Sequence, residues 1–177
     1  PGVNDRPLVT NGGTAYINAN AGTVQRFEVA QNAGTTGYLE IRNGGSLTTT
    51  QPGTSNTYIG SRGTGVLTIQ PGASLTIGPG PVYVGWRSDD QPGALGNGTV
   101  IQNGGTVSLG YNMDLGQNNA NVVGRYEMHG GTLSLTSTTA GYLQVGRIGT
   151  GTFVQDGGDV AINRNTDALM IGSQGAG

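Results

Sequence analysis

Five residues of the sequence have side chains that could bind a ligand. Asp89 and Asp90 are the only adjacent acidic pair, and two neighbouring carboxylates could hold a calcium ion through their oxygens. Tyr58, Tyr83 and Trp86 are aromatic residues that could stack on a sugar or pack against a neighbouring protein. These five residues are the candidate ligand or assembly contacts of the chain.

The acidic pair lies in residues 86–97, which interrupt an otherwise regular pattern and are expected to form an insertion loop. Loops on a rigid scaffold carry function more often than the scaffold does. The plainer interpretation is an exposed excursion with a solvated acidic tip. Both interpretations put Asp89 and Asp90 at the surface.

The acidic residues elsewhere do not predict an active site. General acid–base and glycosidic chemistry need ionisable groups held close together, whereas these residues are scattered along the chain. A calcium repeat of the Gly-Gly-x-Gly-x-Asp type is also absent, since Gly157-Gly158-Asp159 occurs once and lacks the spacing. We therefore predict no catalytic residue, no cofactor and no metal site, and a polysaccharide-processing enzyme is the most distant function considered.

Two other patterns that could do chemistry are expected to be turns. His129 is the only histidine, so no second histidine can share a metal with it. The glycine-rich segments 60–65 and 146–151 resemble phosphate-binding loops, but each precedes a strand pattern rather than a helix.

Composition narrows the class of protein. The 177 residues include ten acidic and eight basic ones, all of the latter arginine, for a formal net charge of -2. Such a chain has no basic surface for a nucleic acid, and no apolar run reaches the roughly 20 residues of a membrane helix. Cysteine is absent, which excludes disulfides. A lysine-free sequence rich in Thr, Asn and Gly is typical of secreted proteins, and the proline at position 1 predicts a processed product or a piece of a longer chain.

A Gly-Gly turn recurs six times, at steps of 26 to 32 residues, and indicates a repeat array. Each turn is followed by residues that alternate between polar and apolar, which predicts a strand with one inward face; after the first turn the inward residues are Ala15 and Ile17. The six turns are Asn11-Gly12-Gly13, Asn43-Gly44-Gly45, Pro71-Gly72-Ala73, Asn103-Gly104-Gly105, His129-Gly130-Gly131 and Asp156-Gly157-Gly158.

Two further strand patterns recur between these turns. One ends at a glycine, as in residues 57–60, and its first copy is residues 27–30. The other precedes the Gly-Gly turn, as in residues 67–69; residues 7–9 are interpreted as a partial copy, and residues 19–25 as a polar connection. Three short strands per unit, each stacked in parallel on its counterpart in the next unit, predict an all-β fold. The expected architecture is a right-handed parallel β-helix, or β-solenoid, with about six coils of about 29 residues in a single domain over residues 1–177.

Two segments carry a resemblance to known repeats. Residues 60–69 (GSRGTGVLTI) and 146–160 (GRIGTGTFVQDGGDV) are similar to the β-helix repeats of bacterial surface proteins, of the autotransporter-passenger and PEP-CTERM-associated type. The resemblance covers roughly residues 9–177 and implies an extracellular, cell-surface β-helix. Such repeats serve as stalks, adhesins, sheaths and enzyme scaffolds, so the resemblance is specific for fold rather than function.

The strand register predicts which side chains are buried. Leu143, Val145, Val160 and Ile162 are expected inside, whereas Gln144 and Asp159 are expected to face solvent. Gln102 and Gln155 are expected to point inward, with their amides paired to backbone groups of a corner. Ser and Thr are expected to form two hydroxyl columns on one outer face, through Ser46, Ser74, Thr106 and Thr132, and through Thr48, Thr76, Ser108 and Ser134.

The two ends of the array predict a partner. Leu8 and Val9 at one end, and Leu169 and Ile171 at the other, are expected at unpaired strand edges with no polar cap. Residues 7–13 are interpreted as the third strand of a coil and its turn, and residues 169–172 as the second strand and its corner, so that the two ends together would make one coil. We therefore expect head-to-tail continuation, between copies or along a longer chain, in a non-enzymatic fibre, stalk or sheath; the alternative is a surface adhesin segment that binds a glycan or protein through exposed aromatic residues.

Overall fold

The computed structural model describes residues 2–51, 55–87, 95–164 and 168–172. These residues form nineteen strands in three parallel sheets, without a helix in the described part of the chain. The backbone winds in about five turns of about 27 residues. The predicted all-β parallel β-solenoid is therefore confirmed. A search of the described residues for a helix long and apolar enough to span a membrane finds none.

Successive strands along the chain fall into the three sheets in rotation, and we name the sheets A, B and C. Sheet A contains β1 (Leu8–Val9), β4 (Glu28–Val29), β7 (Thr57–Ile59), β10 (Val82–Trp86), β13 (Met113–Gln117), β16 (Leu143–Val145) and β19 (Leu169–Ile171). Sheet B contains β2 (Gly13–Ile17), β5 (Thr36–Ile41), β8 (Thr64–Ile69), β11 (Asn97–Gln102), β14 (Val123–Met128) and β17 (Thr150–Gln155). Sheet C contains β3 (Asn20–Val24), β6 (Ser46–Thr49), β9 (Ser74–Ile77), β12 (Thr106–Leu109), β15 (Thr132–Leu135) and β18 (Asp159–Ile162).

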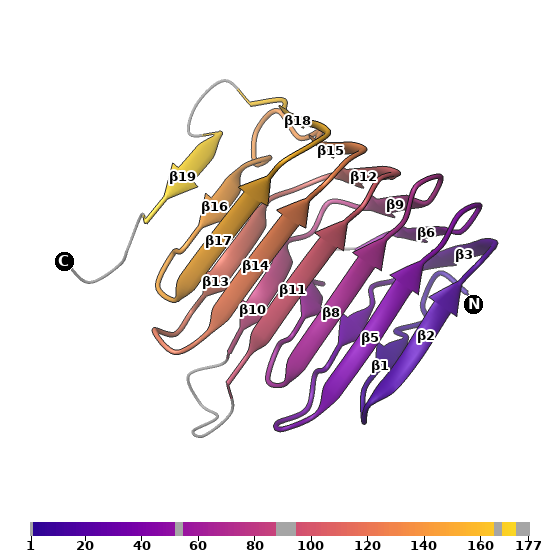
Figure 1. The fold of residues 1–177 in the computed structure, drawn as a ribbon, viewed down its shortest axis with the longest axis horizontal. Coiled ribbons are helices and arrows are strands. Elements are labelled where there is room, and N and C mark those ends of the chain that lie inside the picture. The colour runs from indigo at the N-terminus through magenta and orange to yellow at the C-terminus, as the bar shows by residue number, and fades with distance from the viewer. Residues whose placement is uncertain (1, 52–54, 88–94, 165–167, 173–177) are drawn as a thin grey trace.

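The winding is right-handed. In Figure 1 the strands of sheet B lie nearest the viewer and run upward, the chain returns behind them, and successive coils advance from the N-terminus on the right to the C-terminus on the left. This is the hand expected for parallel crossovers between twisted strands.

The core consists of inward side chains that stack from coil to coil. In sheet B, Leu39, Leu67, Val100, Tyr126 and Phe153 follow one another in register. The first four are at most 5% exposed, and Phe153 in the last coil of the sheet is partly buried. Each fully buried Leu or Val side chain stabilises the fold by about 1.5–3 kcal/mol, so the ladder ties each coil to its neighbours.

One corner depends on a left-handed backbone. A column of six residues along sheet A has φ between 55° and 71°, with 71° at Gly116; its members are Ala30, Gly60, Gly85, Gly116, Gly146 and Gly172. Glycine adopts this conformation without steric cost. Ala30 is the exception in this column, with φ of 55°. The corners of sheet A are therefore a reason for the high glycine content.

The first coil differs from the predicted one. Gly13–Ile17 pairs with β5, so it belongs to sheet B, and the turn at residues 11–13 is not equivalent to the other Gly-Gly turns. Residues 20–24, predicted as a polar connection, form β3 of sheet C. Leu8 and Val9 pair with β4 in sheet A rather than forming a third strand before a Gly-Gly turn.

The physical reason for this error is that period-two alternation does not distinguish one sheet of a solenoid from another. Ala15 and Ile17 fit either sheet B or sheet C. The strand at residues 20–24 was also difficult to predict, because its residues are small and its pairing with β6 shifts register between Asn20 and Thr23. Both ends of the described chain thus lie in sheet A, and the predicted joining of two partial ends into one coil is wrong.

The burial predictions hold at three of the six positions. Leu143 and Val145 are buried and Asp159 is exposed, as expected. Val160 and Ile162 point inward but are only partly buried, because they lie in the last described coil of sheet C. Gln144 was expected in solvent and is only 4% exposed. It lies on the outer face of sheet A, between Asp114 and Met170 in register, and this face is itself largely covered.

Candidate functional site

The outer face of sheet A gathers three of the five predicted contact residues. Tyr58 and Tyr83 are register neighbours on β7 and β10, and the same outward column continues through Asp114 and Gln144. Trp86 lies at the end of β10, beside them. We call Tyr58, Tyr83, Trp86, Asp114 and Gln144 the aromatic face.

The three rings of the aromatic face pack against one another. Ring centroids are 5.5 Å apart for Tyr58 and Tyr83, and 5.0 Å apart for Tyr58 and Trp86. Tyr83 and Trp86 are stacked with centroids 6.3 Å apart. All three side chains are partly exposed. Partly exposed rings beside polar groups are able to contact the apolar face of a sugar or a protein side chain.

Asp114 is the ionisable group of this face and is 1% exposed. Asn112 Nδ2 donates a hydrogen bond to its Oδ2 at 2.5 Å. Burial raises the pKa of Asp114 to about 7, although the charge of Arg147 and the bond from Asn112 oppose the shift. Burial likewise raises the pKa of Tyr83, and the Asp114 charge adds to the effect. A carboxyl group that changes charge near neutral pH therefore lies beside the aromatic rings.

Sequence reasoning missed Asp114 and misplaced Gln144. The sequence pattern does place Asp114 on this outer face, because Asp114 lies between inward Met113 and Leu115 just as Tyr83 lies between Val82 and Val84. The predicted contacts Asp89 and Asp90 lie outside the described residues.

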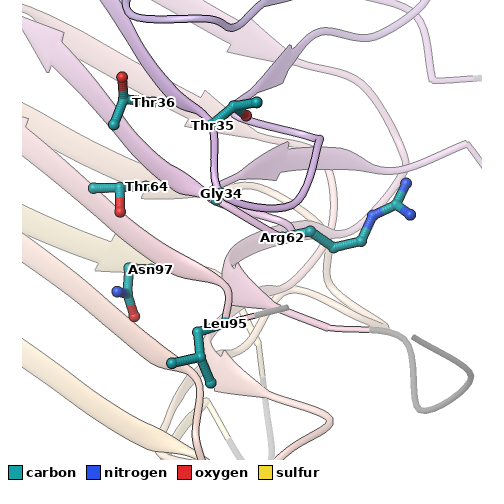
Figure 2. Close-up of a pocket in the computed structure, with 8 residues that line it drawn as sticks. Gly34, Thr35, Thr36, Arg62, Thr64, Leu95 and Asn97 are labelled. Carbon is teal, nitrogen blue, oxygen red and sulfur yellow. The ribbon is translucent and has the colours of Figure 1, made fainter. Parts of the chain in front are cut away.

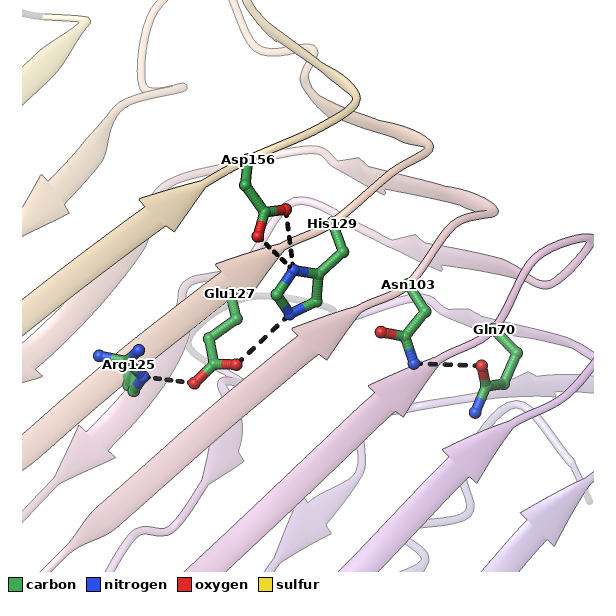
Figure 3. Close-up of polar contacts among 6 residues, drawn as sticks. All are labelled: Gln70, Asn103, Arg125, Glu127, His129 and Asp156. Atoms are coloured by element: carbon green, nitrogen blue, oxygen red, sulfur yellow. Dashed lines mark hydrogen bonds and ion pairs between the residues drawn. The ribbon is translucent and has the colours of Figure 1, made fainter.

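A second polar group lies at the corner between sheets B and C (Figure 3). His129 Nδ1 is 2.8 Å from Asp156 Oδ1 on the following coil, and His129 Nε2 is 3.5 Å from Glu127 Oε2. Arg125 also pairs with Glu127. The bond to Asp156 raises the pKa of His129, and the bond from Arg125 lowers the pKa of Glu127. Because these side chains are substantially exposed, the group is best described as a surface link between coils.

His129 occupies a turn, as predicted. The residues that take the same turn position in the other coils differ in part from those expected. The backbone amides of Gln70, Asn103, His129 and Asp156 each donate to the strand end of the preceding coil, so these residues share one column. Gln70 takes the place predicted for Pro71 because its turn has four residues before the sheet C strand, whereas the turn at Asn103 has three. Asn103 Nδ2 donates to Gln70 Oε1 at 3.2 Å, which continues the polar link along the corner (Figure 3).

A shallow pocket of about 280 Å³ lies at the corner that leads into sheet B (Figure 2). Its walls carry three threonine hydroxyls and the Arg62 side chain, whose Nε donates to the carbonyl of Gln31 at 3.0 Å. The glycine-rich segment 60–65 forms part of it and leads into β8, so the predicted turn is confirmed. Within the described residues, no group of three or more His, Cys, Asp or Glu side chains could hold a metal ion.

The outer face of sheet C carries the two predicted hydroxyl columns. Ser46, Ser74, Thr106 and Thr132 are in register, as are Thr48, Thr76, Ser108 and Ser134. Thr106 Oγ1 donates to Ser74 Oγ at 3.3 Å. Side chains of these types suit the solvent side of a strand.

The apolar core is open at both ends of the described structure. At the N-terminal end, a cavity of about 190 Å³ is lined by Pro7, Val9, Ala15, Ile17, Ala21, Val24, Phe27, Leu39 and Leu47, all of them apolar. At the other end, Leu169 is 55% and Ile171 is 75% exposed. Val9 of β1 lines this cavity, whereas Leu8 is in register with Glu28 and Tyr58 in the outward column of sheet A.

The fold and these surfaces define a β-solenoid repeat protein. No protein-family model, curated protein or solved structure matches the chain.

Proposed function

We propose that this chain is a non-enzymatic β-solenoid element of an extracellular bacterial fibre, stalk or sheath. The single observation that carries the proposal is the open apolar core, with a cavity of about 190 Å³ at one end and exposed Leu169 and Ile171 at the other. Solenoids with unprotected ends associate end to end, because strand edges and apolar residues are both left unpaired there.

The partner of each end is proposed to be another copy of the chain or further repeats of a longer one. Either would extend the three sheets and their ladders by about 4.8 Å per coil. The similarity of residues 60–69 and 146–160 to autotransporter-passenger and PEP-CTERM-associated repeats supports a cell-surface location, as does the lysine-free, Thr- and Asn-rich composition. The net charge of -2 and the absence of lysine argue against nucleic acid as a partner.

Electron microscopy and sedimentation of the 177-residue chain over a range of concentrations test this proposal. We expect linear particles of uniform width whose length increases with concentration. Ile171→Asp should abolish them, since it places a charge at the joint. Thr76→Asp should leave them unchanged, because Thr76 is exposed on the outer face of β9, between two neighbouring strands and away from both ends. A chain that stays monomeric at every concentration would exclude association of copies.

A second function, adhesion to a glycan, is supported by the aromatic face. Tyr58, Tyr83 and Trp86 form a partly exposed cluster beside Asp114 and Gln144. Partly exposed aromatic rings are groups on which proteins stack sugars.

A glycan array probed with the wild type and with Trp86→Ala tests adhesion. Retention that Trp86→Ala removes, and that exposed Tyr16→Ala on sheet B preserves, would support it. Release of new reducing ends from a retained polysaccharide would instead indicate an enzyme.

A further inference from the structure

The pocket at the corner that leads into sheet B carries three polar side chains in a row. Thr36, Thr64 and Asn97 begin β5, β8 and β11 and are register partners, so they lie side by side on neighbouring strands. We call these three residues the polar row. All three are at least partly exposed, and their side chains make no hydrogen bond to another group of the described structure. Two hydroxyls and an amide are thus left for a ligand.

Arg62 provides the charge of the pocket. Its Nε donates to the carbonyl of Gln31 at 3.0 Å, which holds the side chain in place. In Figure 2 the Arg62 side chain lies on one side of Gly34, and the polar row lies on the other. The space at Gly34 is open, because a methyl group added there would meet no atom within 4 Å beyond its chain neighbours.

Among the described residues, no carboxylate forms an ion pair with Arg62. Arg42 and Arg125, by contrast, pair with Glu40 and Glu127. The two terminal nitrogens of Arg62 are therefore not occupied by an ion pair. A guanidinium group matches the two oxygens of a carboxylate in geometry, and such charge-assisted hydrogen bonds are roughly twice as strong as neutral ones.

The charge belongs to this coil and not to the repeat. Arg62 lies two positions before Thr64, and the equivalent positions in the other coils of the same register hold Gly34, Leu95, Asn121 and Ile148. The corner can therefore be built without an arginine.

The pocket adjoins the aromatic face. Arg62 is four positions after Tyr58, so the two Cα atoms are at most about 14 Å apart. The backbone amide of Trp86 donates to the carbonyl of Gly60 at 3.2 Å, and a methyl group at Gly96 would overlap the Trp86 carbonyl. The aromatic rings and the pocket thus meet at this corner.

The size of the pocket limits what it can hold. Its volume of about 280 Å³ lies just below the range of about 300–1,000 Å³ typical of small-molecule sites, so it has room for a single sugar ring. Leu95 is 51% exposed and offers an apolar contact to that ring. The rest of a longer saccharide would lie outside the pocket, next to the rings of Tyr58 and Trp86.

We propose that the pocket binds a uronic acid residue of an acidic glycan, with the carboxylate of the sugar on Arg62 and its hydroxyl groups on the polar row. Threonine hydroxyls and an asparagine amide both donate and accept hydrogen bonds, as sugar hydroxyls do. Neighbouring sugars stack on the aromatic face. The inference rests on the proposed adhesion to a glycan and names the class of glycan.

Trigalacturonic acid and its methyl ester are matched probes, because they differ in the charge of their carboxyl groups. Isothermal titration calorimetry with the 177-residue chain should show tighter binding of the acid. Arg62→Gln should weaken binding of the acid by about tenfold or more and leave binding of the ester unchanged. Trp86→Ala should weaken binding of both probes.

Arg164→Gln is the matched control, since it removes the same charge after β18, in the last described coil of sheet C. It should change the binding of neither probe. Circular dichroism verifies that each variant keeps its β structure. Sodium sulfate distinguishes a sugar from a free anion, because sulfate that binds as tightly as the acid would make the pocket a general anion site and overturn the proposal.

The outcomes separate the inference from the function on which it rests. Binding of the acid that Trp86→Ala weakens and Arg62→Gln leaves unchanged would overturn the uronic acid site and leave glycan adhesion standing. Retention of other glycans on the array without binding of either probe would do the same. Binding of the acid that Arg62→Gln weakens and Trp86→Ala leaves unchanged would overturn the continuous site. Absence of binding to both probes and to the array would overturn the inference and the adhesion together.

Discussion

The hydroxyl of Tyr126 donates a hydrogen bond to Oε1 of Gln102, 2.6 Å away, across the boundary between two coils. Both side chains are fully buried. Because Gln102 Nε2 reaches two backbone carbonyls as well, the predicted inward amide is confirmed at Gln102 as a polar bridge inside an apolar ladder.

Tyr126→Phe is expected to destabilise the chain by about 1–3 kcal/mol, because it leaves Oε1 of a buried amide without its donor. Tyr38→Phe on the same sheet should be nearly neutral, since Tyr38 is 41% exposed. Urea unfolding followed by circular dichroism measures both free energies. Equal effects would show that the bond between Tyr126 and Gln102 contributes nothing net.

Gly116→Ala is expected to be more destabilising than Gly172→Ala, although both glycines are left-handed, with φ of 71° and 63°. Left-handed backbone costs an alanine about 1–2 kcal/mol at either position. At Gly116 the new methyl group would also overlap the carbonyl of Thr150, whereas the space around Gly172 is open. Thermal unfolding should give clearly different melting temperatures for the two variants.

Ala30 provides the reverse test, since it has the same corner conformation with φ of 55°. Ala30→Gly relieves the left-handed strain but adds freedom to the unfolded chain. We expect a neutral to slightly stabilising result, within about 1 kcal/mol. A marked loss of stability would show that the methyl group of Ala30, which is buried, matters more than its backbone strain.

His129 predicts a pH dependence of stability with a defined sign. Its pKa is raised above 6.5, chiefly by the bond to Asp156, so its contribution is complete below pH 6.5 and is lost as the pH rises through the raised value. The pKa of Glu127 is lowered below 4.5, chiefly by Arg125, so its contribution is complete above pH 4.5 and is lost on acidification. The polar link should therefore stabilise the chain most between pH 4.5 and 6.5.

His129→Asn isolates the histidine effect, because asparagine occupies the same turn position in the preceding coil, at Asn103. The difference in unfolding free energy between the two proteins should shrink as the pH rises above the raised pKa of His129. A difference that does not change with pH would mean that His129 acts only through its shape.

Asp114 predicts a further loss of stability with rising pH, of the same sign as the His129 effect. Because burial raises its pKa from 3.8 to about 7, the folded chain favours the neutral acid, and stability should fall as the pH rises from about 4 to about 7. Asp114→Asn keeps the size and removes the charge. Relative to the wild type, it should gain stability at pH 8 and lose this advantage near pH 4. Unfolding curves at the two pH values check this, and equal differences at both would contradict a raised pKa.

Much of the fold could be predicted from the sequence, because glycines and alternating apolar residues recur in every coil. The glycine that ends each sheet A pattern, and inward pairs such as Leu133 and Leu135, correctly predicted the strands of the later coils. The first coil could not be assigned, since Ala15 and Ile17 fit two sheets equally well. Only the pairing of Gly13 with Gly37 decides between them.

The candidate site was harder to predict, because it depends on which outward residues become neighbours. Tyr58, Tyr83 and Trp86 were identified as aromatic residues, but their proximity required the register of β7 and β10. Asp114 lies 31 positions after Tyr83 and joins the face only through pairing with β10. The burial of Gln144 was missed because alternation identifies the side of a strand and carries no information about what covers that side.

The hydrogen bonds of all three sheets run from coil to coil, along the axis of the solenoid. A pull applied at the two ends therefore acts on the coils in series, and the end coil, which has one neighbour, should detach first. Each detached coil would release about 27 residues, or roughly 90 Å of extended chain. Under tension the molecule should lengthen in nearly equal steps, and each step should dissipate the work done in breaking the hydrogen bonds of one coil.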